Sequence, residues 1–107
     1  LDWSVETYSE EVDQELAALP ADMRAHFMHV ARVLEEKGPM NVREPHVKHL
    51  TKKLYEMRMR GKDGISRALY VTVTGKRIVV VRIFVKKTQE TPKREIDLAL
   101  KRAKEIE

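Results

Sequence analysis

The chain has 107 residues, four histidines, no cysteine and a formal net charge of +4. This length suits one domain, over residues 1–107, and the lack of cysteine excludes disulfides and thiolate metal sites. No apolar run reaches the length of a membrane span, so we expect a soluble, cytoplasmic protein that does not interact with membranes.

The first 39 residues predict a strand followed by two helices. Residues 3–8 alternate between apolar or β-branched and polar side chains, as a half-buried strand does, and Ser9 is a candidate N-cap for an acidic helix ending near Leu19. A second helix is predicted from apolar residues at helical spacing, which are Met23, Phe27, Val30, Ala31 and Leu34. Lys37, Gly38 and Pro39 form a typical end to that helix.

Residues 40–53 show no clean hydrophobic period, contain Pro45 and are rich in lysine and histidine, so we expect a positively charged loop without regular structure. Residues 54–92 then predict three consecutive antiparallel strands. The first connection lies at Gly61 to Gly64, and the second is predicted as a two-residue turn at Gly75-Lys76. Finally, Thr91 as N-cap and Pro92 in the first turn predict a helix to the end of the chain.

This order predicts an α+β fold in which a small antiparallel sheet, made of the N-terminal strand and a three-stranded meander, packs with two N-terminal helices and a C-terminal helix. The predicted turns also set the register, which places Leu69 opposite Arg82 and Arg67 opposite Phe84. One face of the meander then collects the polar residues Glu56, Arg58, Arg60, Arg67, Arg82 and Lys86. The other face collects the apolar residues Tyr55, Met57, Met59, Ala68, Tyr70, Val79, Val81, Ile83 and Val85. Parity alone puts Lys87 on the apolar face unless the strand has bulged or ended before it.

The two parts of the chain carry opposite charge. Residues 1–40 hold three Lys/Arg and nine Asp/Glu, a net charge of −6, whereas residues 41–107 hold 18 and 8, a net charge of +10. A basic surface of this kind is typical of proteins that bind a polyanion, most often nucleic acid. Arginines among the apolar positions of strands strengthen that interpretation.

Three ordered blocks of sequence resemble the RelE/HigB-like toxins of bacterial type II toxin-antitoxin modules, in particular the phage-associated HigB-like branch. They are LYEMR at residues 54–58, GKDGISRALY at 61–70, and FVKKTQETP at 84–92 followed by Arg94, Glu95, Ile96 and Ala99. The resemblance covers most of the chain, although residues 1–40 agree in layout more than in sequence.

The resemblance implies a ribosome-dependent mRNA endoribonuclease, or mRNA interferase, that inhibits translation. In such toxins the ribose 2′-hydroxyl attacks the adjacent phosphate without a metal or other cofactor. The resemblance also implies partners, namely the ribosome, mRNA and a cognate HigA-like helix-turn-helix antitoxin through which alone the toxin contacts operator DNA.

The resemblance places the chemistry on Arg67, which aligns with the family's strand arginine, and on Lys86 and Lys87, which align with a basic pair. A guanidinium can meet two phosphate oxygens at once, and fixed cations can stabilise the developing charge. The general base is open among Glu56, His49 and one of the lysines Lys48, Lys52 and Lys53. The lysines that the family carries on the first meander strand are replaced here by Leu54 and Glu56. Candidate RNA- or ribosome-binding residues are Arg58, Arg60, Lys48, Lys52, Lys53 and Arg82.

Other interpretations of the same residues remain. Arg67 could be a structural partner of Glu56, and Arg82 is expected to form an ion pair. His26/His29 and His46/His49 are each spaced i, i+3, but no other ligand signature accompanies them, so we expect no metal site. Alternative functions are a ParE-like DNA gyrase inhibitor, whose relatives generally lack the basic cluster, and a non-catalytic nucleic-acid-binding module.

Overall fold

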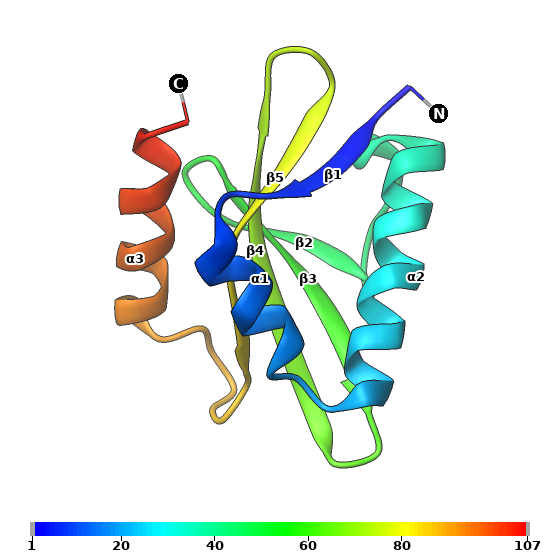
Figure 1. Cartoon of the computed structure of the whole chain (residues 1–107), viewed down its shortest axis with the longest axis vertical. Coiled ribbons are helices and arrows are strands. Elements are labelled where there is room, and N and C mark those ends of the chain that lie inside the picture. Colours follow the sequence, from blue (N-terminus) through cyan, green and yellow to red (C-terminus); the bar gives the residue numbers. More distant parts are fainter. Residues whose placement is uncertain (1, 107) are drawn as a thin grey trace.

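The sequence folds into helices that lie on a five-stranded sheet (Figure 1). This computed structural model describes residues 2–106. In chain order the elements are β1 (Ser4–Thr7), α1 (Glu10–Ala17), α2 (Ala21–Lys37), the short 3-10 helix η1 (Pro39–Asn41), β2 (Val47–Thr51), β3 (Leu54–Gly61), β4 (Gly64–Val73), β5 (Arg77–Val85) and α3 (Lys93–Lys104). The predicted α+β class is confirmed.

The sheet is mixed and not purely antiparallel. Its strand order is β1-β5-β4-β3-β2, in which β2 to β5 pair antiparallel and β1 pairs parallel with β5. The prediction of an antiparallel sheet was therefore wrong for the N-terminal strand. The physical reason is that no hairpin joins β1 to its neighbour β5. The chain leaves β1 at one edge and reaches β2 at the other edge through α1 and α2, so nothing in the connection requires β1 and β5 to be antiparallel.

The predicted loop over residues 40–53 contains a strand. β2 pairs with β3, with Val47 opposite Met57 and Thr51 opposite Leu54, so only Lys52 and Lys53 form the turn. Lys52 has a φ of 51°, in the left-handed region where glycine or asparagine is usual. Because lysine gives no turn signal at this position, the hairpin was not recognised.

The β4–β5 connection differs from the predicted two-residue turn. Val73 pairs with Arg77, which leaves Thr74, Gly75 and Lys76 in the turn, with φ values of 90° at Gly75 and 59° at Lys76. A register shift then follows, because Tyr70 pairs with Val80 whereas Leu69 pairs with Arg82. The longer turn and this bulge compensate each other, so the predicted pairs of Leu69 with Arg82 and Arg67 with Phe84 are confirmed.

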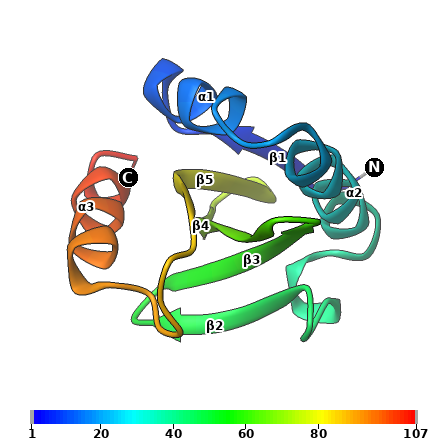
Figure 2. The ribbon, with the colours of Figure 1, turned by 90° about the horizontal axis from the view of Figure 1, so that it is seen from below.

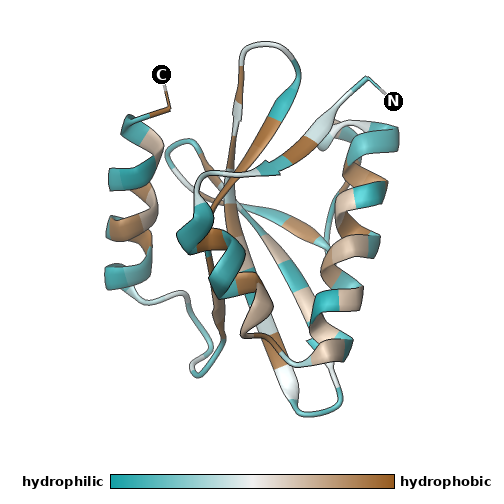
Figure 3. Cartoon of the chain, viewed as in Figure 1, coloured by the Kyte–Doolittle hydropathy of each residue, from teal (hydrophilic) through white to brown (hydrophobic). Residues whose placement is uncertain are grey.

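Two apolar clusters lie on opposite faces of the sheet. The larger joins α1 and α2 to residues such as Met57, Ala68 and Tyr70, and the smaller joins Ala99 and Ala103 of α3 to Leu54, Leu69, Val71, Val79 and Val81. Figure 2 shows α1 and α2 above the sheet and α3 apart from them, and Figure 3 shows brown apolar segments along the strands between these helices. The longer turn shifts the parity of β5 until the bulge restores it, so the prediction that Val79 and Val81 share a face with Met57, Ala68 and Tyr70 was wrong. Val85, predicted on the same apolar face, is exposed.

The helices themselves follow the predicted pattern. The five predicted apolar residues of α2 are buried, and Gly38, with a φ of 84°, ends that helix. Pro92, and not Thr91, occupies the N-cap of α3. Among residues 2–106, no helix combines the length and apolar character needed to cross a bilayer.

We expect Tyr70→Phe to raise the free energy of unfolding by about 1 kcal/mol. The Tyr70 ring is fully buried, and its hydroxyl has no hydrogen-bond partner among the described residues, so folding removes the hydroxyl from water without replacing that interaction. The same burial raises the pKa of Tyr70. Urea denaturation measures the change, with Tyr55→Phe, at a partly exposed tyrosine, as the control. A loss of stability in Tyr70→Phe would mean that the hydroxyl has a partner in solution.

Candidate functional site

The strands bring most of the predicted polar residues to one face. Arg58 is directly opposite Arg67 across β3 and β4, and Glu56 is opposite Leu69, which in turn is opposite Arg82 on β5. Facing residues in an antiparallel pair share a side of the sheet. The predicted polar face therefore exists, but α3 and the segment before it cover much of it.

The Glu56 and Arg67 side chains form a buried ion pair. Arg67 Nε lies 3.2 Å from Glu56 Oε1, and the two side chains are 4% and 0% exposed. The two groups form an ion pair and not a hydrogen bond, because neither Arg67 Nε nor Glu56 Oε1 has a hydrogen-bond partner among residues 2–106. Two charges buried together are stabilised by each other, and removing one leaves the other uncompensated.

Arg67 also holds the segment that follows β5. Its Nη2 donates a hydrogen bond to the carbonyl oxygen of Gln89 at 2.8 Å, and its Nη1 donates to the hydroxyl of Thr91. All three guanidinium nitrogens thus contact the protein. In this conformation Arg67 and Glu56 leave almost no surface for a ligand to contact. Their contacts fix the position of residues 86–92, which we call the basic loop.

Lys86 and Lys87 lie side by side at the start of the basic loop, after β5 has ended. The Lys86 amide still donates to Ile65 O at 2.8 Å, and then the chain leaves the sheet. Both lysines line two surface depressions of about 470 and 400 Å³, the first shared with Gly64 and Gln89, the second with Glu90 and Arg94. Strand parity therefore does not separate the two lysines, because Val85 is the last residue of β5.

Glu90 is an acid-base group at this site that the sequence did not single out. It is exposed, lines the second depression and has no side-chain partner among residues 2–106, whereas Glu56 is buried and Glu95, also at this depression, is ion-paired. Arg94 joins the same depression from the first turn of α3. Both residues belong to the third sequence block that resembles the toxin family, but the sequence analysis gave neither of them a role.

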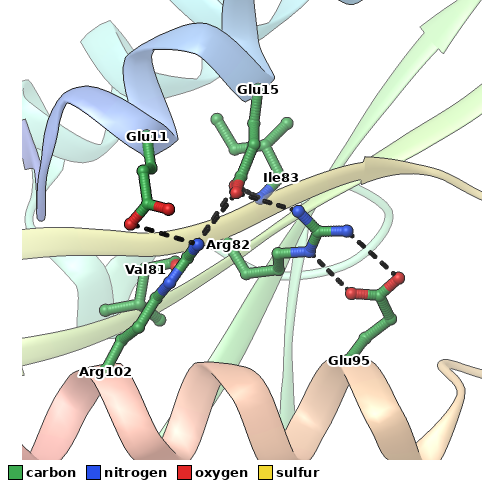
Figure 4. A network of polar contacts seen from close by, with 7 residues as sticks. All are labelled: Glu11, Glu15, Val81, Arg82, Ile83, Glu95 and Arg102. Carbon is green, nitrogen blue, oxygen red and sulfur yellow. Dashed lines mark hydrogen bonds and ion pairs between the residues drawn. The ribbon is translucent and has the colours of Figure 1, made fainter.

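Arg82 belongs to a network that ties α1, β5 and α3 together (Figure 4). Its guanidinium contacts Glu95 at 2.6 Å and Glu15 at 2.8 Å, and Arg102 contacts Glu15 at 3.1 Å. The hydrogen bond to Glu95 raises the pKa of Arg82, and Glu15 adds to that rise against the opposing effect of burial. The expected ion pair is confirmed, and it leaves Arg82 poorly placed to bind RNA.

The same network covers the edge of β5 beyond the end of β1. Glu15 accepts a hydrogen bond from the Ile83 amide at 3.0 Å, and Arg102 donates to Val81 O at 2.7 Å. Side chains thus satisfy backbone groups that a neighbouring strand would otherwise pair.

The remaining candidate RNA-binding residues form two groups. Arg58, Arg60 and Lys48 lie on β3 and β2, where Arg60 is exposed and Arg58 and Lys48 are partly exposed. Arg58 Nε is buried without a hydrogen-bond partner among the described residues. Lys52 and Lys53 lie instead at the β2–β3 turn, beside the C-terminal half of α3, and so are separated from Lys86 and Lys87 by most of that helix.

His49 lies in the β2–β3 hairpin, away from the basic loop. Its ring packs on Tyr55 with centroids 5.0 Å apart, and its Nε2 lies 2.7 Å from Lys52 O. His49 and Lys48, Lys52 and Lys53, all named as possible bases, do not line either depression beside Lys86 and Lys87.

The other three histidines form a cluster between α2 and the start of β2. The ring centroids of His26, His29 and His46 lie 6.0 to 6.4 Å apart. His26 Nδ1 accepts a hydrogen bond from the Arg60 amide, so its neutral ring carries the proton on Nε2, which cannot then bind a metal. Over residues 2–106, no group of three or more His, Cys, Asp or Glu is arranged to hold a metal ion.

We expect the His26 cluster to make stability depend on pH. Burial lowers the pKa of His26, and His46, His29 and Arg60 lower it further. The folded state therefore binds fewer protons than the unfolded state between the lowered pKa and about 6.5, so stability rises with pH there and is lost as pH falls. Urea denaturation at about pH 7.5 and about pH 5.5 tests this.

His26→Asn is the matched variant, because Asn offers an acceptor near the position of Nδ1 but does not titrate. It should show a smaller loss of stability between the two pH values than the unmodified protein. Equal losses in the two proteins would contradict a role for His26.

Comparison with known proteins identifies the family. The sequence model described as "Phage derived protein Gp49-like (DUF891)" matches residues 14–104. No curated protein matches the chain. Among solved structures, a mutant E. coli toxin RelE in the free state has a TM-score of 0.66 at 13% identity, over 95% of this chain and 98% of that chain. RelE in the RelE-RelB complex of Pyrococcus horikoshii OT3 has a TM-score of 0.58 at 22% identity, over 79% of this chain and 96% of that chain.

These structural likenesses confirm the predicted RelE-like fold. The family match covers most of the chain and agrees with the phage-associated branch predicted from the three sequence blocks. The chain belongs to the family of phage-derived Gp49-like proteins and has the fold of the RelE toxins.

Proposed function

We propose that this protein is the toxin of a type II toxin-antitoxin module and cleaves mRNA on the ribosome, in the cytoplasm, within one domain over residues 1–107. The observation that carries this proposal is the position of Lys86 and Lys87. They lie together at two depressions, on a loop that the buried Arg67 holds in place. The Gp49-like family and the RelE fold support it.

The proposed reaction needs only groups of the chain and the RNA. The 2′-hydroxyl oxygen attacks the adjacent phosphorus as its proton passes to a base, the bond from phosphorus to the 5′-oxygen breaks, and that oxygen takes up a proton. The products are a 2′,3′-cyclic phosphate and a 5′-hydroxyl. Fixed cations stabilise the phosphoryl oxygens as charge builds on them.

The geometry favours a division of these roles. Lys86 and Lys87 are the cations that reach the phosphate and the leaving oxygen, and Glu90 is placed to accept the proton, since it lines the same depression and is exposed. Arg67 and Glu56, first considered as catalytic residues, act as positioning residues through the basic loop. Arg58, Arg60 and Lys48 remain candidates for binding RNA beside the site.

The proposed partners are the ribosome with its mRNA and a cognate antitoxin of the HigA-like helix-turn-helix type. One structural relative is described as a RelE-RelB complex, which supports an antitoxin partner for this chain. Operator DNA would then be contacted only through the antitoxin.

Expression of the chain without an antitoxin tests the proposal. Transcript ends are mapped with translation active and with initiation blocked. We expect cuts in phase with codons that disappear when translation stops. Intact messages accompanied by gyrase-linked DNA breaks would support the ParE-like alternative instead, and RNA binding without cleavage would support a non-catalytic module.

A further inference from the structure

A second basic site lies at the opposite end of α3 from Lys86 and Lys87. A groove of about 390 Å³ between the β2–β3 turn and α3 is lined by Lys52, Lys53, Asp97, Leu100, Lys101 and Lys104. We call it the lysine groove. Four of its six lining residues are lysines, and the two elements that supply them are far apart in the sequence.

The charge of the lysine groove is strongly positive. Among residues 2–106, Asp97 is the single acidic residue that lines it, and Lys93 lies 2.8 Å from that carboxylate and offsets its charge. The four lysine residues of the groove are exposed, and none has an ion-pair partner among residues 2–106. Nearby Arg102 is different, because Glu15 and Val81 hold it against β5.

The backbone around the groove is well fixed. Lys52 and Lys53 occupy a two-residue turn closed by the pairing of Thr51 with Leu54, and the Lys52 carbonyl oxygen lies 2.7 Å from His49 Nε2. On the other side, Lys101 and Lys104 lie three residues apart on one face of α3, whose buried Ala99 and Ala103 pack on the sheet. The lysine side chains of the groove therefore extend from two elements whose backbone is fixed, the β2–β3 turn and α3.

We propose that the lysine groove binds the phosphate backbone of folded RNA, as a docking site separate from the cleavage site. Clustered lysines bind phosphates as point charges without reading bases. In the described part of the chain, no arginine or aromatic side chain, the types that read or stack on bases, lines the groove. This proposal rests on the proposed function, because it takes the ribosome as the source of the folded RNA.

The placement of the groove fits a folded ribosomal RNA that lies along α3 beside the mRNA at the cleavage site. Arg94 lines a depression at the start of α3 and Lys101 lines the groove near its end, so the helix rise separates them by about 10 Å. The exposed residues Lys93, Arg94, Lys101 and Lys104 connect the two places along the helix. Figure 1 shows α3 running between the basic loop and the level of the β2–β3 turn. The phosphate backbone of a folded RNA can therefore follow α3 into the groove while mRNA occupies the cleavage site.

Binding to purified 70S ribosomes tests the proposal without relying on cleavage. The test variants are Lys52→Asn with Lys53→Ala, and Lys101→Ala with Lys104→Ala; Asn is chosen because residue 52 has a positive φ. For each pair we expect the dissociation constant for ribosomes to rise about tenfold at moderate salt. The slope of log K against log salt concentration should become less steep by about two, one for each lysine removed. Lys37→Ala with Lys76→Asn removes two exposed lysines elsewhere and should bind ribosomes as the unmodified protein does.

The outcomes are distinct. If the unmodified protein cleaves on ribosomes while both groove variants bind as it does, the groove proposal fails alone. If the unmodified protein does not bind ribosomes, the groove proposal fails together with the proposed function. If groove variants bind ribosomes normally but escape neutralisation by a co-expressed antitoxin, the groove holds an acidic protein segment, and the proposal is again overturned.

Discussion

Arg67→Ala should lower the free energy of unfolding by about 3 to 5 kcal/mol, the largest effect we expect from one substitution. The change leaves the Glu56 carboxylate, which is 0% exposed, without its cation. It also removes the contacts to Gln89 and Thr91 that hold the basic loop. Urea denaturation with fitted m-values measures the loss.

Two further variants separate the ion pair from the loop contacts. Glu56→Leu with Arg67→Met replaces both charges by apolar side chains and should recover much of the stability lost in Arg67→Ala. Thr91→Val keeps the ion pair and should cost about 1 kcal/mol. If Arg67→Ala unfolds at the same urea concentration as the unmodified protein, the ion pair is not buried as described.

This expectation changes how an activity assay on Arg67 must be interpreted. A loss of toxicity in Arg67→Ala is equally expected of a catalytic group and of a structural one, because the variant is less stable and its basic loop has lost two anchors. Activity therefore has to be expressed per folded molecule. A variant that stays folded and loses activity only partly would agree with a positioning role.

Lys87→Ala should reduce the rate of mRNA cleavage by about 10²-fold to 10³-fold, which is typical for removal of one preorganised group that stabilises the transition state. Lys87 is exposed and lines both depressions, so the substitution should change stability by less than about 0.5 kcal/mol. Lys86→Ala should have an effect of the same kind. Rates are measured on programmed ribosomes with saturating toxin.

Lys37→Ala is the matched control, since Lys37 is an exposed lysine in the last turn of α2, remote in sequence from the basic loop. It should cleave at the unmodified rate. If Lys86→Ala with Lys87→Ala cleaves as fast as this control, these lysines do not act on the phosphate, and the site must be sought around Arg58 and Arg60.

The sequence predicted which face of the sheet most strand residues occupy better than it predicted how far their side chains are buried. The pairing of Leu69 with Arg82 was correct because a longer turn and a bulge cancel, although neither has a clear sequence signal. Parity places Arg67 on the polar face but says nothing of what covers it. Gln89 and Thr91, which contact its guanidinium, lie more than 20 residues further along the chain, in a segment that folds back over that face.

Other features escaped prediction for related reasons. β2 is five residues long and ends in a turn with Lys52 at positive φ, so neither its period nor its turn was recognisable. The lysine groove lies between the β2–β3 turn, which was expected to be part of a loop, and the last turns of α3. The histidine cluster likewise joins α2 to residue 46, and only tertiary structure brings these rings together.

The measurement that tests the account most directly uses purified protein, 70S ribosomes and a defined mRNA placed in the ribosomal A site. A matched mRNA carries a 2′-deoxyribose at the cleaved position. We predict that the unmodified mRNA is cut only on the ribosome, with a 2′,3′-cyclic phosphate and a 5′-hydroxyl as products, and that the deoxy mRNA stays intact. Cleavage of the deoxy mRNA at the same position, or no cleavage of either mRNA by folded protein, would contradict the account.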